Sequence, residues 1–198
     1  MADLPPDLDE HSDRLRWNAK YERGAGGAFD VHPLAVRALA VPPPDGPVLD
    51  LACGPSGAAL AAAADGRAVT AVDVSEVALG LLGEEARRRG VGERITLVQA
   101  DLARWRPSPG RYALVLCTGF WEREIFGPAA TAVMPCGVLA WEAFTAGTRR
   151  ARPDLPAGWC LGPGEPAALL PPGFTVLAEE DVADGAKRRL LARRKAAT

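Results

Sequence analysis

A ten-residue stretch, residues 48–57, constrains the fold of this chain more than any other. Its sequence is Val-Leu-Asp-Leu-Ala-Cys-Gly-Pro-Ser-Gly, so a short apolar run ends in an acid and is followed at once by a glycine turn. An apolar, alanine-rich run follows at residues 58–64. This order predicts a buried strand, a tight loop and a helix N-terminus, the ligand-binding corner of an open α/β sheet. Gly54 allows close approach of a ligand because it has no Cβ and tolerates positive φ.

The rest of the chain alternates strand-like and helix-like segments. We expect further strands near residues 68–73, 95–101, 112–118 and 137–144, with helices between them. Alternation of this kind predicts a mainly parallel sheet with right-handed crossovers. Two later β-rich runs, residues 174–180 and 187–193, flank the turn Asp184-Gly185 and predict an antiparallel pair. The predicted fold class is therefore α/β, with a doubly wound, mainly parallel sheet and an antiparallel C-terminal edge hairpin.

The first thirty residues do not share this alternation. We expect an N-terminal segment at residues 1–30, with a short helix over residues 15–21, and a single ligand-binding domain at residues 31–198. Trp17 and Tyr21 lie four residues apart and share one face of that helix. Their spacing fits a packed face and a cover over the site equally well.

Acidic residues close three successive predicted strands, at Asp50, Asp73 and Asp101. These strand ends meet at the edge where doubly wound sheets bind ligands. Asp73 is placed to accept hydrogen bonds from ribose hydroxyls, and Asp101, beside Leu102, from an adenine amino group. A single acid at a strand end is often only a helix cap. Three in register with a glycine loop indicate a nucleoside site.

Two nucleotide-type cofactors compete for this corner. A dinucleotide fingerprint has the pattern G-x-G-x-x-G, whereas the corresponding positions here are Ala52, Gly54 and Gly57. The carboxylate of Asp50 is badly placed beside a pyrophosphate and well placed near a cation. S-adenosylmethionine, which carries a sulfonium and an ammonium group, therefore fits better than NAD.

Together these motifs resemble the class I S-adenosylmethionine-dependent methyltransferases, and more narrowly the small bacterial TehB-like (tellurite-resistance-like) enzymes. The matching segments are residues 17–21, 48–57, 72–79, 100–102, 120–126, 135–139, 141–145 and 162–165. The resemblance implies a methyltransferase that uses S-adenosylmethionine and acts on a small molecule. The chain departs from the pattern at Ala52 and Cys136, where glycine is common, and at residues 148–158, which lack an expected Asn-Pro.

The predicted cofactor-binding residues lie at the strand ends and in the glycine loop: Asp50, Ala52, Cys53, Gly54, Asp73, Val74, Asp101, Leu102 and Cys117. The acceptor is expected just past the fourth strand, at Phe120, Trp121 and Arg123. The acceptor is expected to be soft or oxyanionic. The guanidinium of Arg123 suits an oxyanion, although a surface salt bridge with a neighbouring glutamate explains it equally well.

No catalytic residue is assigned from the sequence. A general base, where the acceptor needs one, is expected beside residues 118–123 or near Glu142. His11 and His32 lie outside the motifs and are not expected to be catalytic.

Composition narrows the function further. The 198 residues are 48% hydrophobic, which is enough for one core, and the net charge of −2 argues against a nucleic-acid partner. No apolar run reaches bilayer length, so we expect no membrane partner. The four cysteines form no C-x-x-C pair, which favours reduced thiols, a cytoplasmic location and no metal site. A monomer or homodimer is expected, and an NAD-type oxidoreductase or a catalytically silent cofactor-binding regulator are the alternative functions.

Overall fold

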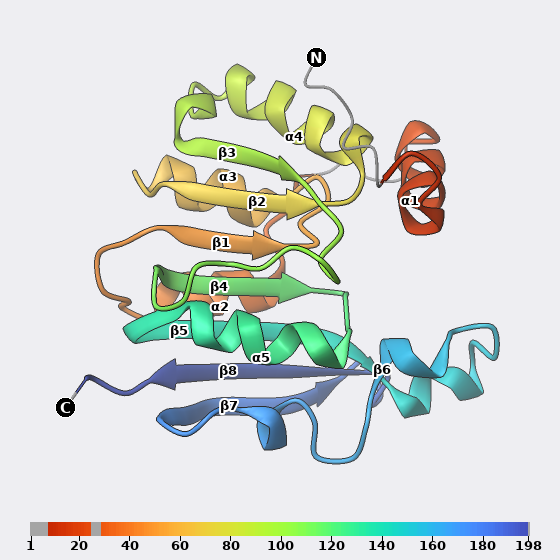
Figure 1. Cartoon of the computed structure of the whole chain (residues 1–198), viewed down its shortest axis with the longest axis vertical. Coiled ribbons are helices and arrows are strands. Elements are labelled where there is room, and N and C mark those ends of the chain that lie inside the picture. Colours follow the sequence, from red (N-terminus) through yellow and green to blue (C-terminus); the bar gives the residue numbers. More distant parts are fainter. Residues whose placement is uncertain (1–7, 25–28, 198) are drawn as a thin grey trace.

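A single sheet organises the computed structural model, which describes residues 8–24 and 29–197 (Figure 1). Its strands are β1 (Val48–Leu51), β2 (Val69–Asp73), β3 (Ile95–Gln99), β4 (Tyr112–Thr118), β5 (Val133–Thr145), β6 (Cys160–Leu161), β7 (Phe174–Val182) and β8 (Lys187–Arg194). Their order is β3-β2-β1-β4-β5-β8-β7, with β6 beside β5. Strands β1 to β6 pair in parallel, while β8 is antiparallel to both β5 and β7. The predicted doubly wound sheet with its antiparallel C-terminal hairpin is confirmed.

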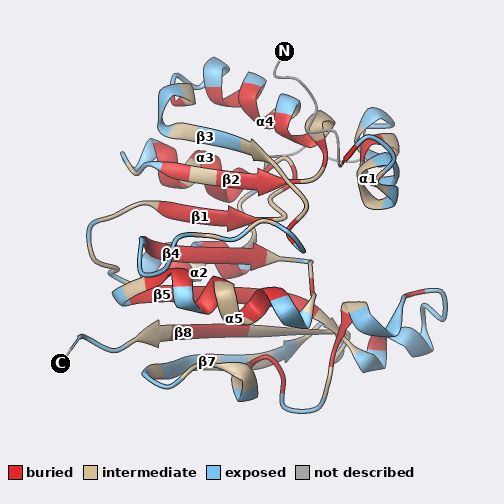
Figure 2. Ribbon diagram, viewed as in Figure 1, coloured by how far each residue is buried: buried red, intermediate tan, exposed pale blue. Residues whose placement is uncertain are grey.

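Helices cover both faces of this sheet. They are α1 (Ser12–Glu22), α2 (Pro33–Ala40), α3 (Gly57–Ala64), α4 (Glu76–Arg88) and α5 (Arg123–Ala132). Helices α2, α3 and α4 pack in one apolar cluster with Leu114 and Leu116, while α5 packs in a second cluster with Val115. Alternate residues of β4 thus face opposite layers, as the pleat of a strand requires. Figure 2 shows the result, with the central strands buried and the outer strand β7 largely exposed.

Helix α1 lies at the carboxyl ends of the parallel strands (Figure 1). The guanidinium Nε of Arg14 donates to Glu76 Oε2 at 2.9 Å, and the hydroxyl of Ser75 donates to Asn18 Oδ1 at 2.7 Å. Ser75 also accepts a hydrogen bond from the backbone N–H of Ala78, so it caps the N-terminus of α4. These contacts fasten α1 to the start of α4 and hold it over the sheet edge. These contacts favour the interpretation that Trp17 and Tyr21 cover the site.

The third glycine of the loop makes the closest packing contact of this corner. A Cβ on Gly57 would lie 2.4 Å from the carbonyl oxygen of Phe29 and 2.5 Å from that of Asp30. Only glycine therefore allows the start of α3 to pass the chain that leads into α2.

Two features differ from the sequence prediction. Strand β5 begins at Val133 rather than near residue 137, because it bends through a register shift against β4. The short strand β6 was not predicted, since two residues carry no periodic signal.

The domain boundary near residue 30 stays a prediction, and residues 1–7 and 25–28 of that N-terminal segment lie outside the described residues. Within the described ranges, no helix has the length and apolarity needed to cross a membrane.

Candidate functional site

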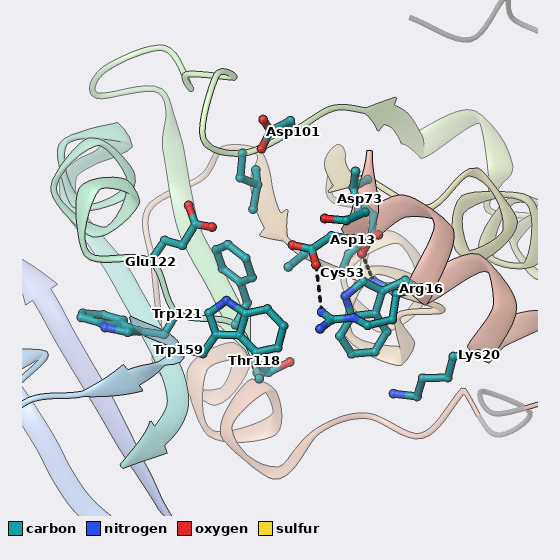
Figure 3. Close-up of a pocket in the computed structure, with 18 of the residues that line it drawn as sticks. Asp13, Arg16, Lys20, Cys53, Asp73, Asp101, Thr118, Trp121, Glu122 and Trp159 are labelled. Atoms are coloured by element: carbon teal, nitrogen blue, oxygen red, sulfur yellow. Dashed lines mark hydrogen bonds and ion pairs between the residues drawn. The ribbon is translucent and has the colours of Figure 1, made fainter. Parts of the chain in front are cut away.

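A cavity of about 850 Å³ opens at the carboxyl ends of the parallel strands (Figure 3). This volume falls within the range of about 300–1,000 Å³ that is usual for small-molecule sites. Its lining comes from α1, from the loops after β1, β2, β3 and β4, and from the segment that follows β5. The site is therefore at the edge of the sheet that the sequence motifs predicted.

The glycine loop forms the floor of this cavity. Ala52 and Gly54 both have positive φ, +47° and +56°. The backbone N–H of Gly54 donates to Asp73 Oδ2 at 2.8 Å. A Cβ on Gly54 would lie 2.8 Å from the hydroxyl oxygen of Tyr21 on α1. The loop thus needs glycine both for its backbone conformation and for the space between it and the covering helix.

Asp73 presents a buried carboxylate to the cavity at the predicted ribose position. Burial raises its pKa, while hydrogen bonds from the backbone N–H groups of Ser75 and Gly54 oppose that rise. The same surroundings act on Tyr21, because burial and the negative charge of Asp73 raise the pKa of its phenol. Tyr21 therefore stays neutral beside the carboxylate.

Asp101 and Leu102 line the cavity at the predicted adenine position. One oxygen of Asp101 accepts a hydrogen bond from the N–H of Ala103 at 2.9 Å, and the other lies 3.7 Å from Nε2 of His11. The His11 Nδ1 atom is buried and has no hydrogen-bond partner among the described residues. His11 was missed from the sequence because nothing in its neighbourhood marks it as part of a motif.

The placement of Asp50 corrects the sequence prediction. Its side chain is only 2% exposed and does not line the cavity. The hydroxyl of Ser56 donates to Asp50 Oδ2 at 2.5 Å and also accepts from the N–H of Ala59, so Asp50 supports the cap of α3. Burial raises the pKa of Asp50 to about 7, which the hydrogen bond from Ser56 partly offsets. Asp50 therefore supports the loop and the start of α3 from behind and is not part of the cavity lining.

Cys117 is likewise buried and outside the cavity lining. Its thiol faces the carbonyl oxygen of Phe120 at 3.8 Å, and burial raises its pKa. The other predicted cofactor residues, Ala52, Cys53 and Val74, do line the cavity.

On the acceptor side, Phe120 and Trp121 line the cavity as predicted. The indole Nε1 of Trp141 donates to the carbonyl oxygen of Phe120 at 3.0 Å, which fixes the turn after β4. Arg123 does not line the cavity. Its guanidinium lies 2.8 Å from Glu165 Oε1, and its side chain is 63% exposed. The salt-bridge interpretation therefore describes Arg123, although the partner is distant in sequence and not an adjacent glutamate.

Glu122 is the carboxylate that faces the acceptor side of the cavity (Figure 3). Burial raises its pKa, and the negative charges of Asp101 and Asp13 raise it further. A carboxylate with a raised pKa is better suited to accept a proton than an ordinary surface glutamate.

Glu142, the other region where a base was expected, plays a different part. It is fully buried, and Lys187 and Arg189 each donate to it at 2.6 Å, while His32 Nε2 lies at 3.2 Å. Burial alone would raise its pKa, but the hydrogen bonds from these three residues hold it at about 2. Glu142 is a permanent anion that ties β5 to β8, so it is not a base.

Residues 48–133 match the model of a methyltransferase domain. The chain carries a methyltransferase domain. Its fold is that of the class I S-adenosylmethionine-dependent methyltransferases, as solved structures show. A search of curated proteins finds no match.

Three solved structures illustrate the likeness of this methyltransferase fold. The 1,6-didemethyltoxoflavin-N1-methyltransferase of Burkholderia thailandensis has a TM-score of 0.70 and 19% identity over 98% of this chain and 92% of that chain. Magnesium protoporphyrin IX methyltransferase of Synechocystis PCC 6803 has a TM-score of 0.68 and 18% identity over 94% and 100%. TehB of Haemophilus influenzae has a TM-score of 0.67 and 19% identity over 89% and 66%. The resemblance to TehB is therefore one of fold, no stronger than that to the other two.

Proposed function

We propose that this methyltransferase domain transfers a methyl group from S-adenosylmethionine to a small-molecule acceptor. One observation carries the proposal: a single cavity joins the predicted nucleoside residues Asp73 and Asp101 to an aromatic side formed after β4. Solved structures of the same fold, from Burkholderia and Synechocystis, contain S-adenosylhomocysteine. The methyltransferase-domain match gives no support to the alternative of an NAD-type oxidoreductase.

The residues present fit this cofactor. The buried Asp73 carboxylate suits ribose hydroxyls, Asp101 and Leu102 suit an adenine ring, and Gly54 lines the cavity without a side chain. When bound, S-adenosylmethionine supplies a methyl group on a positively charged sulfur, which is already activated for transfer. The chain must therefore mainly align the acceptor and exclude water.

Glu122 is the proposed general base for acceptors that need one. A hydroxyl or amine acceptor loses a proton as its lone pair forms the new bond to the methyl carbon, and the Glu122 carboxylate accepts that proton. The electron pair of the broken carbon–sulfur bond stays on sulfur. A thiolate acceptor is already an anion and needs no base.

The test combines binding and turnover. Calorimetric titrations with S-adenosylmethionine, S-adenosylhomocysteine and NAD should show binding of the first two and none of the third. A screen of thiols, phenols, amines and oxyanions should then show release of S-adenosylhomocysteine with at least one class. Tight binding without any release would contradict the proposal and favour the catalytically silent regulator.

The cellular setting is also proposed. The four cysteines are all free, which supports a reducing, cytoplasmic location. The net charge of −2 supports a small-molecule partner in preference to nucleic acid. A monomer or homodimer is the proposed assembly.

A further inference from the structure

Three cationic side chains, Arg16, Lys20 and Arg152, line the same cavity. Arg16 and Lys20 come from α1, and Arg152 comes from the segment between β5 and β6. Figure 3 shows Arg16 and Lys20 apart from Asp101 and Glu122 across the cavity. We call the wall formed by Arg16, Lys20 and Arg152 the basic side of the cavity.

Among the described residues, only one of the three charges of this basic side has a carboxylate partner. Asp13 lies 3.1 Å from Arg16. Within residues 8–24 and 29–197, no carboxylate forms an ion pair with Lys20 or Arg152. Burial lowers the pKa of Lys20, and the positive charges of Arg16 and Arg152 lower it further. Like charges gathered in a partly closed cavity repel each other, so a bound anion would stabilise this arrangement.

Aromatic rings hold these cations in place. Lys20 Nζ lies 4.1 Å from the ring centroid of Trp17, and the guanidinium carbon of Arg16 lies 4.2 Å from that of Trp159. The guanidinium carbon of Arg152 lies 5.3 Å from the ring centroid of Phe144. Contacts of this kind orient a cation without using its N–H donors. The three rings, those of Trp17, Phe144 and Trp159, also line the cavity.

The segment that carries Arg152 and Trp159 is tied to the body of the protein. Its first turn, Ala146–Arg150, is anchored where the hydroxyl of Thr148 donates to the carbonyl oxygen of Ala186. Arg149 Nε then donates to the carbonyl oxygen of Leu155 at 3.0 Å, which closes the loop around Arg152. The segment is the one where the sequence departs from the related family pattern.

We propose that the acceptor is a planar aromatic molecule that carries an anionic group, bound between Lys20 and Arg152 and against the rings of Trp159 and Phe144. This inference rests on the proposed methyltransferase function and names its substrate class. The sequence assigned the anion site to Arg123, which does not line the cavity; the proposed site is formed by Lys20 and Arg152. S-adenosylmethionine itself carries one carboxylate, so the experiment must separate an acceptor anion from that group.

Salicylate and salicylamide are suitable probes, because they share a ring and a hydroxyl and differ in charge. Each is titrated into the full chain saturated with S-adenosylhomocysteine, near neutral pH. We expect salicylate to bind at least about 10-fold more tightly than salicylamide, as loss of a charge-assisted hydrogen bond implies. Lys20→Met and Arg152→Met should each remove most of this preference and change the affinity for S-adenosylhomocysteine less than about twofold.

Arg150→Met is the matched control, since Arg150 is an exposed arginine of the same segment that does not line the cavity. It should keep the preference for salicylate. Equal binding of the two probes would overturn the inference. So would a loss of S-adenosylhomocysteine affinity in Lys20→Met and Arg152→Met with unchanged salicylate binding, because the cations would then hold the cofactor carboxylate. A preference for salicylate without methyl transfer to any acceptor would support the anionic ligand and contradict the proposed function. Methyl transfer together with equal binding of the two probes would support the proposed function and contradict the anionic ligand.

Discussion

The backbone N–H of Gly54 donates a 2.8 Å hydrogen bond to the carboxylate of Asp73, which lies 19 residues further along the chain. This bond joins the glycine loop after β1 to the acid at the end of β2. The second oxygen of Asp73 accepts from the N–H of Ser75 at 2.9 Å, so the carboxylate also shapes the start of α4. The proposed ribose ligand is therefore part of the frame of the loop, and the two motifs do not act independently.

Asp73→Ala should weaken binding of S-adenosylhomocysteine by about 2–4 kcal/mol, since hydrogen bonds to charged groups contribute about 1.5–3 kcal/mol each before overlap. It should also lower the free energy of unfolding by about 1–3 kcal/mol, because buried N–H groups lose their acceptor. Calorimetry and urea unfolding measure the two effects. Asp45→Ala, an exposed acid away from the cavity, should change neither. Unchanged affinity in Asp73→Ala would remove Asp73 from the cofactor site.

The strand ends were predictable because they are local patterns. An apolar run that ends in an acid marks both Asp73 and Asp101, and the structure places both at the cavity. The same pattern misassigned Asp50, since the pattern does not reveal that Ser56 holds that carboxylate behind the loop.

The basic side of the cavity was beyond prediction for a different reason. Arg16 is one of many charged residues on α1, and its position over Trp159 depends on how a long segment after β5 folds back. That segment contains only short helical turns, and its sequence has no hydrophobic periodicity from which its path could be predicted. Arg123 illustrates the opposite error. Its position after β4 predicted a role in acceptor binding, but its guanidinium pairs with Glu165.

Ala52 and Cys136 stand where glycine is common in the family pattern, and both have positive φ, +47° and +64°. A side chain there strains the backbone. Ala52→Gly and Cys136→Gly should therefore each raise the free energy of unfolding by about 1 kcal/mol, measured by urea unfolding. Ala61→Gly, inside helix α3, should lower it by about 1 kcal/mol. A loss of stability in both positive-φ variants would show that the native backbone carries no such strain.

Glu122→Gln should slow methyl transfer to a hydroxyl acceptor by about 10²- to 10⁴-fold, the usual contribution of a general base. In the wild type, kcat/KM should rise with pH through a pKa above the ordinary 4.5 of glutamate, because burial and nearby carboxylates disfavour the ionised base. The variant should lose that rise. Transfer to a thiolate should change little, and the neighbouring Glu124→Gln should keep the wild-type profile. An unaltered profile in Glu122→Gln would assign proton removal elsewhere.

Asp50 should make the stability of the fold depend on pH. Its pKa is raised from 3.8 to about 7 in the folded protein, chiefly by burial. Below the unfolded pKa both states are protonated. Between the two values the unfolded state ionises first, so the folded state binds more protons and its stability falls as pH rises. The contribution is lost by the time pH passes the folded pKa.

Asp50→Asn stays neutral at every pH and keeps an oxygen that accepts from Ser56. Urea unfolding of wild type and variant from about pH 4 to about pH 8 isolates the contribution of Asp50, because the other groups cancel in the difference. The stability of the variant relative to wild type should increase with pH over this range by up to about 4 kcal/mol, at 1.36 kcal/mol per unit of pKa difference. Asp45→Asn, exposed on the surface, should show no such trend. A constant difference between wild type and Asp50→Asn would mean that Asp50 titrates alike in both states, and its buried carboxylate would then have to be ionised beside Ser56.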